Sequence, residues 1–452
     1  MVGGTNARLL PTVATVLSAV GLLAAPGAVG GADAGGGALD PSFGNRGLAH
    51  IGGIRSCLPG EGGCPMTVGL VIERDGAVLV AAGTLDPDCR SRFALARLTK
   101  EGKSDRHFGS GGRVLTRFGS RSAVSTAMVA TSDGRIVVAG ELKEPEPSVD
   151  CVDPGAHLHL GGTPGLALAR YDPDGRLDKT FGGDGRIVAR LDDVNAADVL
   201  AQPDGKVVVV GSSTNRLVLA RYDRRGRLDS SFGTNGTVFH DPGGFVAPSG
   251  AALDRVGRIL VSVSPNCAPC PASVARFTGD GHLDPTFGRD GRAFLPTRSA
   301  QLHAVAVADG RIVAAGVEWL SRRRLVVTRF SSNGALDQSF GRGGLASLRV
   351  PRVSFVNDVA IQRNGRIVLV TTRFPFKSPK APVDFTLTRL LTNGSVDRTF
   401  GTGGKATADF GFSDVGEAVA IQPDGKLVVA GVIGDRPGLY RADALGVARY
   451  LP

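Results

Sequence analysis

The stretch Leu177–Gly185, LDKTFGGDG, decides the fold, because the chain repeats it with small changes along almost its whole length. The phenylalanine of each copy falls at position 43, 108, 181, 232, 287, 340 or 400. Internal repetition of this kind is typical of proteins built from one structural unit used many times. The other copies are Leu39–Gly47 (LDPSFGNRG), Ser104–Gly112 (SDRHFGSGG), Leu228–Gly236 (LDSSFGTNG), Leu283–Gly291 (LDPTFGRDG), Leu336–Gly344 (LDQSFGRGG) and Val396–Gly404 (VDRTFGTGG).

Most repeats also contain an Asp-Gly or Asn-Gly pair between two runs of apolar residues. The clearest examples are Asp198–Gly211 (DVLAQPDGKVVVVG) and Ala418–Gly431 (AVAIQPDGKLVVAG). Such a pair predicts a tight β-hairpin in which both central residues have positive φ. The pairs are Asp75-Gly76, Asp133-Gly134, Asp204-Gly205, Asp309-Gly310, Asn364-Gly365 and Asp424-Gly425, with Val256-Gly257 as the degenerate copy.

A third signature is an arginine near the end of the strand that precedes each LDxxFG turn or the C-terminus. The residues are Arg97, Arg170, Arg221, Arg276, Arg329, Arg389 and Arg449. Each repeat then contains four short strands, and no helical periodicity occurs after residue 34. We therefore predict an all-β protein, a seven-bladed β-propeller with four-stranded antiparallel blades. A parallel β-helix is the alternative, but its repeats are usually much shorter.

The ends of the chain predict how the ring closes. The last repeat ends directly after its arginine-containing strand, so the last blade lacks a fourth strand. We predict that Gly47–Ile51 supplies this strand by pairing near Gly446–Leu451, which also removes an exposed sheet edge. Strands are lettered A to D from the axis outward, and the small-residue strand before each Asp-Gly turn is expected to be the innermost, strand A.

The combined pattern LDxxFGxxG, QPDGKxVVxG and ALARYxxDG resembles the bacterial delta-60 repeat family, with a blade order similar to that of NHL-type propellers. The resemblance covers residues 38–452 in seven copies. It implies an exported propeller, and it transfers no catalytic residue to this chain.

The first 34 residues differ from the repeats and have the features of a secretory signal peptide. Arg8 precedes the apolar run Leu9–Ala25, and Ala32-Asp33-Ala34 is an A-x-A cleavage candidate. We expect residues 35–452 to form one secreted propeller, monomeric and without a membrane span, because the apolar run is short and contains Pro11.

The formal net charge of +10 favours an anionic partner, although solubility alone also explains it. For an exported chain we expect an extracellular protein or polysaccharide partner rather than nucleic acid. The B–C and D–A loops differ between repeats, and variable loops on a rigid scaffold usually carry binding sites. Aromatic and cationic residues in these loops suit an anionic polymer or a stacked sugar. The candidates are Trp319, Arg322, Arg323, Arg324, Phe374, Phe376, Lys377, Arg436, Tyr440 and Arg441.

The six cysteines all fall in the variable loops. In an exported protein an even number of cysteines predicts disulfides. We expect Cys267 and Cys270 to form a local bridge, and Cys57, Cys64, Cys89 and Cys151 to pair among themselves in one of three ways. A redox role for the C-x-x-C pair is the weaker interpretation, because its loop offers no helix N-terminus.

The repeated arginine and aspartate, such as Arg170 and Asp178, are expected to be a structural pair, because seven identical active sites are implausible. The sequence presents no catalytic constellation, no complete set of metal ligands and no cofactor motif. We therefore expect a non-enzymatic binding or scaffold module. The alternative is a secreted lyase or hydrolase at the mouth of the central channel, where His303, Asp198 and Asp358 are the nearest candidates.

Overall fold

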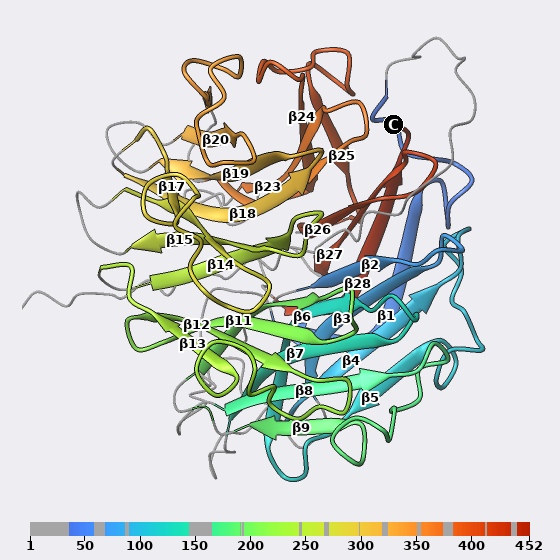
Figure 1. The fold of residues 1–452 in the computed structure, drawn as a ribbon. Helices are drawn as coiled ribbons and strands as arrows, with labels where there is room; N and C mark the ends of the chain where they lie inside the picture. The colour runs from blue at the N-terminus through green and yellow to red at the C-terminus, as the bar shows by residue number, and fades with distance from the viewer. Residues whose placement is uncertain are drawn as a thin grey trace, which may run out of the picture.

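The computed structural model describes residues 36–57, 68–85, 90–143, 165–189, 191, 194–243, 246–265, 271–297, 299–318, 324–349, 354–373, 383–411, 414–434 and 441–452. These residues form seven antiparallel sheets of four strands each (Figure 1). The first strand of each sheet contacts the first strands of both neighbouring sheets, so the sheets form a closed ring. The prediction of a seven-bladed, all-β propeller is confirmed, and the described residues contain no helix that could cross a membrane.

The strands follow one another as a meander from the axis outward in every blade. Blade 1 consists of β2 (Gly69–Ile72), β3 (Val78–Leu85), β4 (Ser91–Leu98) and β5 (Arg113–Thr116). Blade 2 consists of β6 (Ser122–Ala130), β7 (Ile136–Lys143), β8 (Gly165–Tyr171) and β9 (Arg186–Ala189). Blade 3 consists of β10 (Val194–Ala201), β11 (Val207–Ser213), β12 (Arg216–Tyr222) and β13 (Thr237–His240). Blades 4 and 5 consist of β14 (Val246–Leu253), β15 (Ile259–Pro265), β16 (Ser273–Phe277), β17 (Arg292–Phe294); and β18 (Ala300–Ala308), β19 (Arg311–Glu318), β20 (Arg324–Phe330), β21 (Leu345–Arg349). Blades 6 and 7 consist of β22 (Ser354–Ile361), β23 (Ile367–Arg373), β24 (Phe385–Leu390), β25 (Lys405–Ala408); and β26 (Asp414–Ile421), β27 (Leu427–Gly434), β28 (Arg441–Tyr450), β1 (Leu48–Cys57).

The hairpin turns differ in one respect from the sequence prediction. Gly205 has a φ of 81°, but Asp204 before it does not have positive φ. The backbone N–H of Gln202 donates to the carbonyl of Lys206, and that of Gly205 to the carbonyl of Gln202. This is a longer loop in which a turn is followed by one left-handed glycine. The two-residue geometry with positive φ at both centres occurs at Asp309-Gly310.

The ring closes through a strand from the N-terminal end of the chain, as predicted. Leu48 pairs with Ala448 and Ile51 pairs with Leu445, in antiparallel register. Strand β1 continues beyond the predicted segment to Cys57, with an irregularity after Gly52. Blade 7 therefore combines three strands from the C-terminus with one from the N-terminus.

The repeated arginine joins three parts of the fold. Arg170 donates from Nε to Oδ2 of Asp178 over 2.7 Å, and its guanidinium lies 4.5 Å from the ring centre of the buried Phe181. Its Nη1 donates over 2.6 Å to the carbonyl of Arg224 in the next blade. Each such arginine thus ties strand C to its own LDxxFG turn. The equivalent ion pairs are Arg221–Asp229, Arg276–Asp284, Arg329–Asp337, Arg389–Asp397 and Arg449–Asp40.

Blade 1 departs from this arrangement. Nε of Arg97 lies 2.7 Å from Oε2 of Glu73, and its Nη1 is 3.4 Å from the Asp105 carboxylate. Burial raises the pKa of Glu73 to about 7, against the opposing effect of the Arg97 charge. Nη2 of Arg97 also donates to Oδ2 of Asp75 over 3.1 Å, so the arginine of this blade is shared among three carboxylates.

Candidate functional site

The two faces of the ring differ in kind. The Asp-Gly and LDxxFG turns lie together on one face, which we call the turn face. The B–C and D–A loops, which start and end at the opposite strand ends, form the other face, which we call the loop face. On the turn face, the charged residues of the repeats are engaged in the arginine–aspartate pairs described above.

Most of the binding residues predicted from the sequence lie outside the described part of the chain. These are Trp319, Arg322, Arg323, Phe374, Phe376, Lys377, Arg436 and Tyr440. Of the remaining two, Arg441 begins β28 and Arg324 begins β20, both at the loop face. Cys57 ends β1, and the other five cysteines lie outside the described residues.

Arg324 lies directly opposite a second arginine. The register of β20 and β21 pairs Arg324 with Arg349, at the loop-face end of both strands. Blade 1 has arginines at the same two positions, Arg92 before Phe93 and Arg117 after Thr116, as the register of β4 and β5 shows. Like charges directly opposite each other destabilise a sheet. On its other side Arg324 lies opposite Glu318 of β19, so a carboxylate flanks this arginine pair.

The innermost strands carry a β-bulge at one common position. In β18 the bulged residue is His303, in β22 it is Asn357, and in β26 it is Glu417, as the register shifts show. Bulges redirect side chains, and they are frequent beside functional sites. These residues are buried near the axis. The corresponding residues of the other described bulges are Thr126, Ala197 and Ser249.

Asp198 and Asp358 follow the bulge in two of these strands, and each connects its blade to the next. Oδ1 of Asp198 accepts from the N–H of Val199, and Oδ2 accepts from the N–H of Ala251 in blade 4, both over 2.8 Å. Asp358 bonds in the same way to Val359 over 2.7 Å and to Val419 in blade 7 over 2.8 Å. Burial raises the pKa of both carboxyl groups. Both side chains therefore act as ties between inner strands.

His303 and Glu417 have pKa values displaced in opposite directions. Burial lowers the pKa of His303 to about 4 and raises that of Glu417 to about 8, with the charge of Asp358 adding to the effect on Glu417. Among the described residues, Nε2 of His303 has no hydrogen-bond partner, and its ring centre lies 5.9 Å from that of Phe355 in an edge-to-face arrangement. His303 was identified from the sequence, but Glu417 was missed. The sequence feature that could have revealed Glu417 is the presence of an acidic residue within a strand of mostly small residues.

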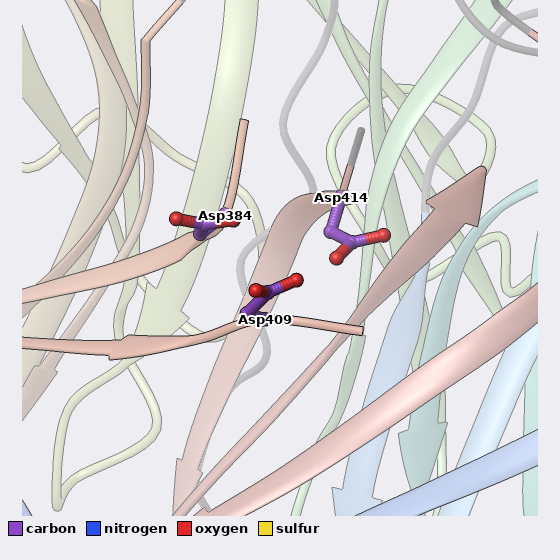
Figure 2. Close-up of side chains that lie close together, drawn as sticks. All are labelled: Asp384, Asp409 and Asp414. Atoms are coloured by element: carbon purple, nitrogen blue, oxygen red, sulfur yellow. The ribbon is translucent and has the colours of Figure 1, made fainter. Parts of the chain in front are cut away.

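A cluster of three aspartates lies at the loop face between blades 6 and 7. Asp384 precedes β24, Asp409 follows β25 and Asp414 begins β26 (Figure 2). One carboxylate oxygen from each lies within 4.8 Å of the others. We call this group the acidic cluster. The sequence did not identify it, because Asp384 is far from Asp414 along the chain.

Comparisons with known proteins agree with the fold. The profile of a family described as a domain of unknown function (DUF5122) β-propeller matches residues 155–181, 202–232 and 308–340. No curated protein matches the sequence significantly. A streptogramin B lyase structure is 12% identical, with a TM-score of 0.51 over 90% of this chain and 97% of that one. A catalytically inactive virginiamycin B lyase from Staphylococcus aureus, solved with quinupristin, is 11% identical, with a TM-score of 0.51 over 90% of this chain and 99% of that one. At this level of identity the similarity shows the fold alone.

Proposed function

We propose that this chain is an exported, non-enzymatic propeller that binds an anionic extracellular partner, a polysaccharide or a protein, through its loop face. The observation that carries the proposal is the pairing of Arg324 with Arg349 across β20 and β21. An anion bound between the two guanidinium groups would relieve their repulsion, and arginine binds carboxylate and phosphate groups in bidentate fashion. The net charge of +10 supports the same class of partner.

The polar groups at the axis support a structural rather than a catalytic role. Asp198 and Asp358 accept backbone N–H groups with both carboxylate oxygens. Asn357 donates from Nδ2 to Thr372 over 2.7 Å and to the carbonyl of Gly416 over 2.6 Å. A catalytic base needs an oriented partner, and Nε2 of His303 has none among the described residues.

Binding to immobilised polyanions across a salt series tests the proposal. The test uses two resins, a polyuronate and a sulfated polysaccharide, and a separate immobilised acidic protein fraction. The variant Arg324→Ser/Arg349→Ser should elute at lower salt than the unaltered protein, because exposed charges bind anions through screened attraction. The control Arg363→Ser/Arg398→Ser removes the same charge from exposed positions of the turn face and should elute close to the unaltered protein. If both variants elute at the same lowered salt concentration, the effect is one of net charge alone, and a binding site on the loop face is contradicted.

A second candidate function is a lyase or hydrolase at the channel mouth, and the opposite pKa displacements of His303 and Glu417 favour it. A panel of polysaccharide, ester and lactone substrates tests this candidate. Turnover that disappears in both His303→Gln and Glu417→Gln, with the fold intact by circular dichroism, would replace the binding proposal. Turnover that survives both changes would exclude these residues from catalysis.

A further inference from the structure

The acidic cluster occupies positions that the other described blades fill with basic, neutral or apolar residues, apart from one aspartate in blade 3. The strand registers identify these positions in each blade. The position of Asp384 is occupied by arginine in three other blades, at Arg92, Arg216 and Arg324. The position of Asp409 is occupied by Arg117, Asp241, Pro296 and Arg349 in blades 1, 3, 4 and 5. Only in blade 6, among the described blades, are both positions acidic.

The third position makes the contrast sharper. Asp414 stands where Ala123, Val194 and Ala300 stand in blades 2, 3 and 5. Those three side chains belong to the buried core, and Asp414 itself is 0% exposed. A carboxylate has therefore replaced an apolar core side chain at the one place where two further carboxylates meet it. Burying a charge without a partner is costly, so the arrangement calls for a compensating charge.

The hydrogen bonds of the cluster leave oxygen atoms unused. Oδ2 of Asp414 accepts from the N–H of Phe410 over 2.7 Å, but its Oδ1 has no partner among the described residues. The buried Oδ1 of Asp384 also has none there. Figure 2 shows the three carboxylates gathered at one place, from two adjacent blades. In the described part of the chain, no lysine, arginine or histidine forms an ion pair with any of the three.

From this geometry we propose that Asp384, Asp409 and Asp414 bind a divalent cation of the Ca²⁺ class that links blade 6 to blade 7. The donors are all oxygen atoms, as hard cations require, and no thiol or imidazole of a described residue takes part. Two oxygen ligands of one ion lie at most about 4.8 Å apart when each is about 2.4 Å from it, and one oxygen of each aspartate lies within that limit of the others. Mg²⁺ is less suited, because it requires shorter bonds and strict octahedral geometry.

The site has a direct structural consequence. Asp384 and Asp409 belong to blade 6, whereas Asp414 begins the innermost strand of blade 7. Between them, the ring of Phe410 lies 5.0 Å from that of Phe385 and 5.2 Å from that of His50 on the closing strand. A bound cation would therefore stabilise the junction at which the N-terminal strand completes the ring.

Thermal unfolding of the full chain, after treatment with a chelator and titration with CaCl₂, tests the site. The melting temperature should rise by about 1.5 °C for each tenfold increase in calcium above the dissociation constant. The response should vanish in Asp409→Asn and in Asp414→Asn, while calcium-free Asp414→Asn should melt no lower than the calcium-free unaltered protein. A purely structural aspartate would give the opposite result, a lower melting temperature at every calcium concentration.

Asp241 offers a matched control. Its Oδ1 accepts from the N–H of Gly243 over 2.9 Å, as Oδ1 of Asp409 accepts from Gly411 over 2.7 Å, and both residues are exposed. Asp241→Asn should keep the full calcium response, because Arg216 stands where Asp384 stands, and Val246, which begins the first strand of the next blade, stands where Asp414 stands. No response of the unaltered protein up to about 10 mM CaCl₂, where sites of extracellular modules are saturated, would overturn the proposal. So would a response of the same size to MgCl₂, or one that persists in Asp414→Asn.

Discussion

Nε of Arg276 donates to Oδ2 of Asp284 over 2.9 Å, and both side chains are almost fully buried. The same guanidinium lies 4.3 Å from the ring centre of Phe287, and its Nη1 donates to the carbonyl of Ser332 in the next blade. One side chain therefore connects a strand, its following turn and the neighbouring blade. The same hydrogen bond to the next blade recurs at Arg170, Arg221, Arg329 and Arg449.

Removing Arg276 should destabilise the protein strongly. We expect Arg276→Ala to lower the free energy of unfolding by about 3–5 kcal/mol, because the nearest cation to the buried Asp284 carboxylate is then Arg258 at 3.9 Å. Arg276→Lys should recover only part of the loss, since lysine cannot contact the carboxylate and the neighbouring carbonyl at once. Urea denaturation provides the measurement. Arg176→Ala, which removes an exposed pair with Asp174, is the control and should change stability by less than about 1 kcal/mol.

A buried hydroxyl pair distinguishes two otherwise equivalent blade junctions. The hydroxyl of Tyr171 donates to Oγ1 of Thr116 over 2.6 Å. At the equivalent junction, where Tyr450 belongs to the same core cluster as Ala408, alanine stands in place of the threonine, and the Tyr450 hydroxyl has no partner among the described residues. Thr116→Ala should therefore cost about 1–3 kcal/mol by leaving the Tyr171 hydroxyl unpaired. An unfolding midpoint equal to that of the unaltered protein would show that water replaces the threonine at no cost.

Glu417 should impose a falling pH dependence on stability. Burial raises its pKa to about 8, above its value of 4.5 in the unfolded chain, so folding takes up a proton between these two pH values. The free energy of unfolding then decreases as pH rises through this interval, by at most about 1.4 kcal/mol per unit, and the dependence ends above pH 8. Glu417→Gln should remove this contribution. Parallel stability curves for the two proteins between pH 5 and pH 8 would contradict the assignment.

The closing strand should be essential for the intact ring. Removing residues 1–57 deletes β1 together with Asp40, the partner of Arg449, and Phe43, over which that arginine lies at 4.6 Å. We expect the shortened protein to unfold at lower temperature and to aggregate, because β28 becomes an open sheet edge. A protein lacking only residues 1–35 is the control and should melt as the full chain does. Equal melting temperatures for both would show that ring closure contributes nothing.

Much of the fold follows from local chemistry that the sequence displays. Glycines of the hairpin turns, such as Gly205, and buried phenylalanines, such as Phe181, recur at fixed places in each repeat. The structure predicted for one repeat is therefore supported by the same pattern in the other repeats. The register of the closing strand was also predictable, because the repeat begins and ends at different points of a blade. The turn type was not, since one additional loop residue changes which positions need positive φ.

The candidate sites were harder to predict, because they depend on departures from the repeat. Glu417 becomes noticeable only when β26 is aligned with the other inner strands by its bulge. The acidic cluster requires three loop ends to be placed in space, and two of them belong to different blades. Neither the position of the bulge nor the placement of the loop ends follows from the turn motifs in the sequence. These motifs determine the hairpins and leave the conformation of the loops between them undetermined.

One repeated set of backbone hydrogen bonds between blades runs in a single sense around the ring. The N–H of the glycine after each repeated phenylalanine donates to a carbonyl of the following blade, as Gly182 does to Arg225, and Gly401 completes the series by donating to Gly36. In an assembly of separate subunits, such head-to-tail contacts would be heterologous, and they close only at the number of subunits that their rotation permits. The seven blades of this single polypeptide are thus arranged as the subunits of a cyclic heptamer would be. A chain shortened by whole blades would have two complementary ends and would polymerise through them.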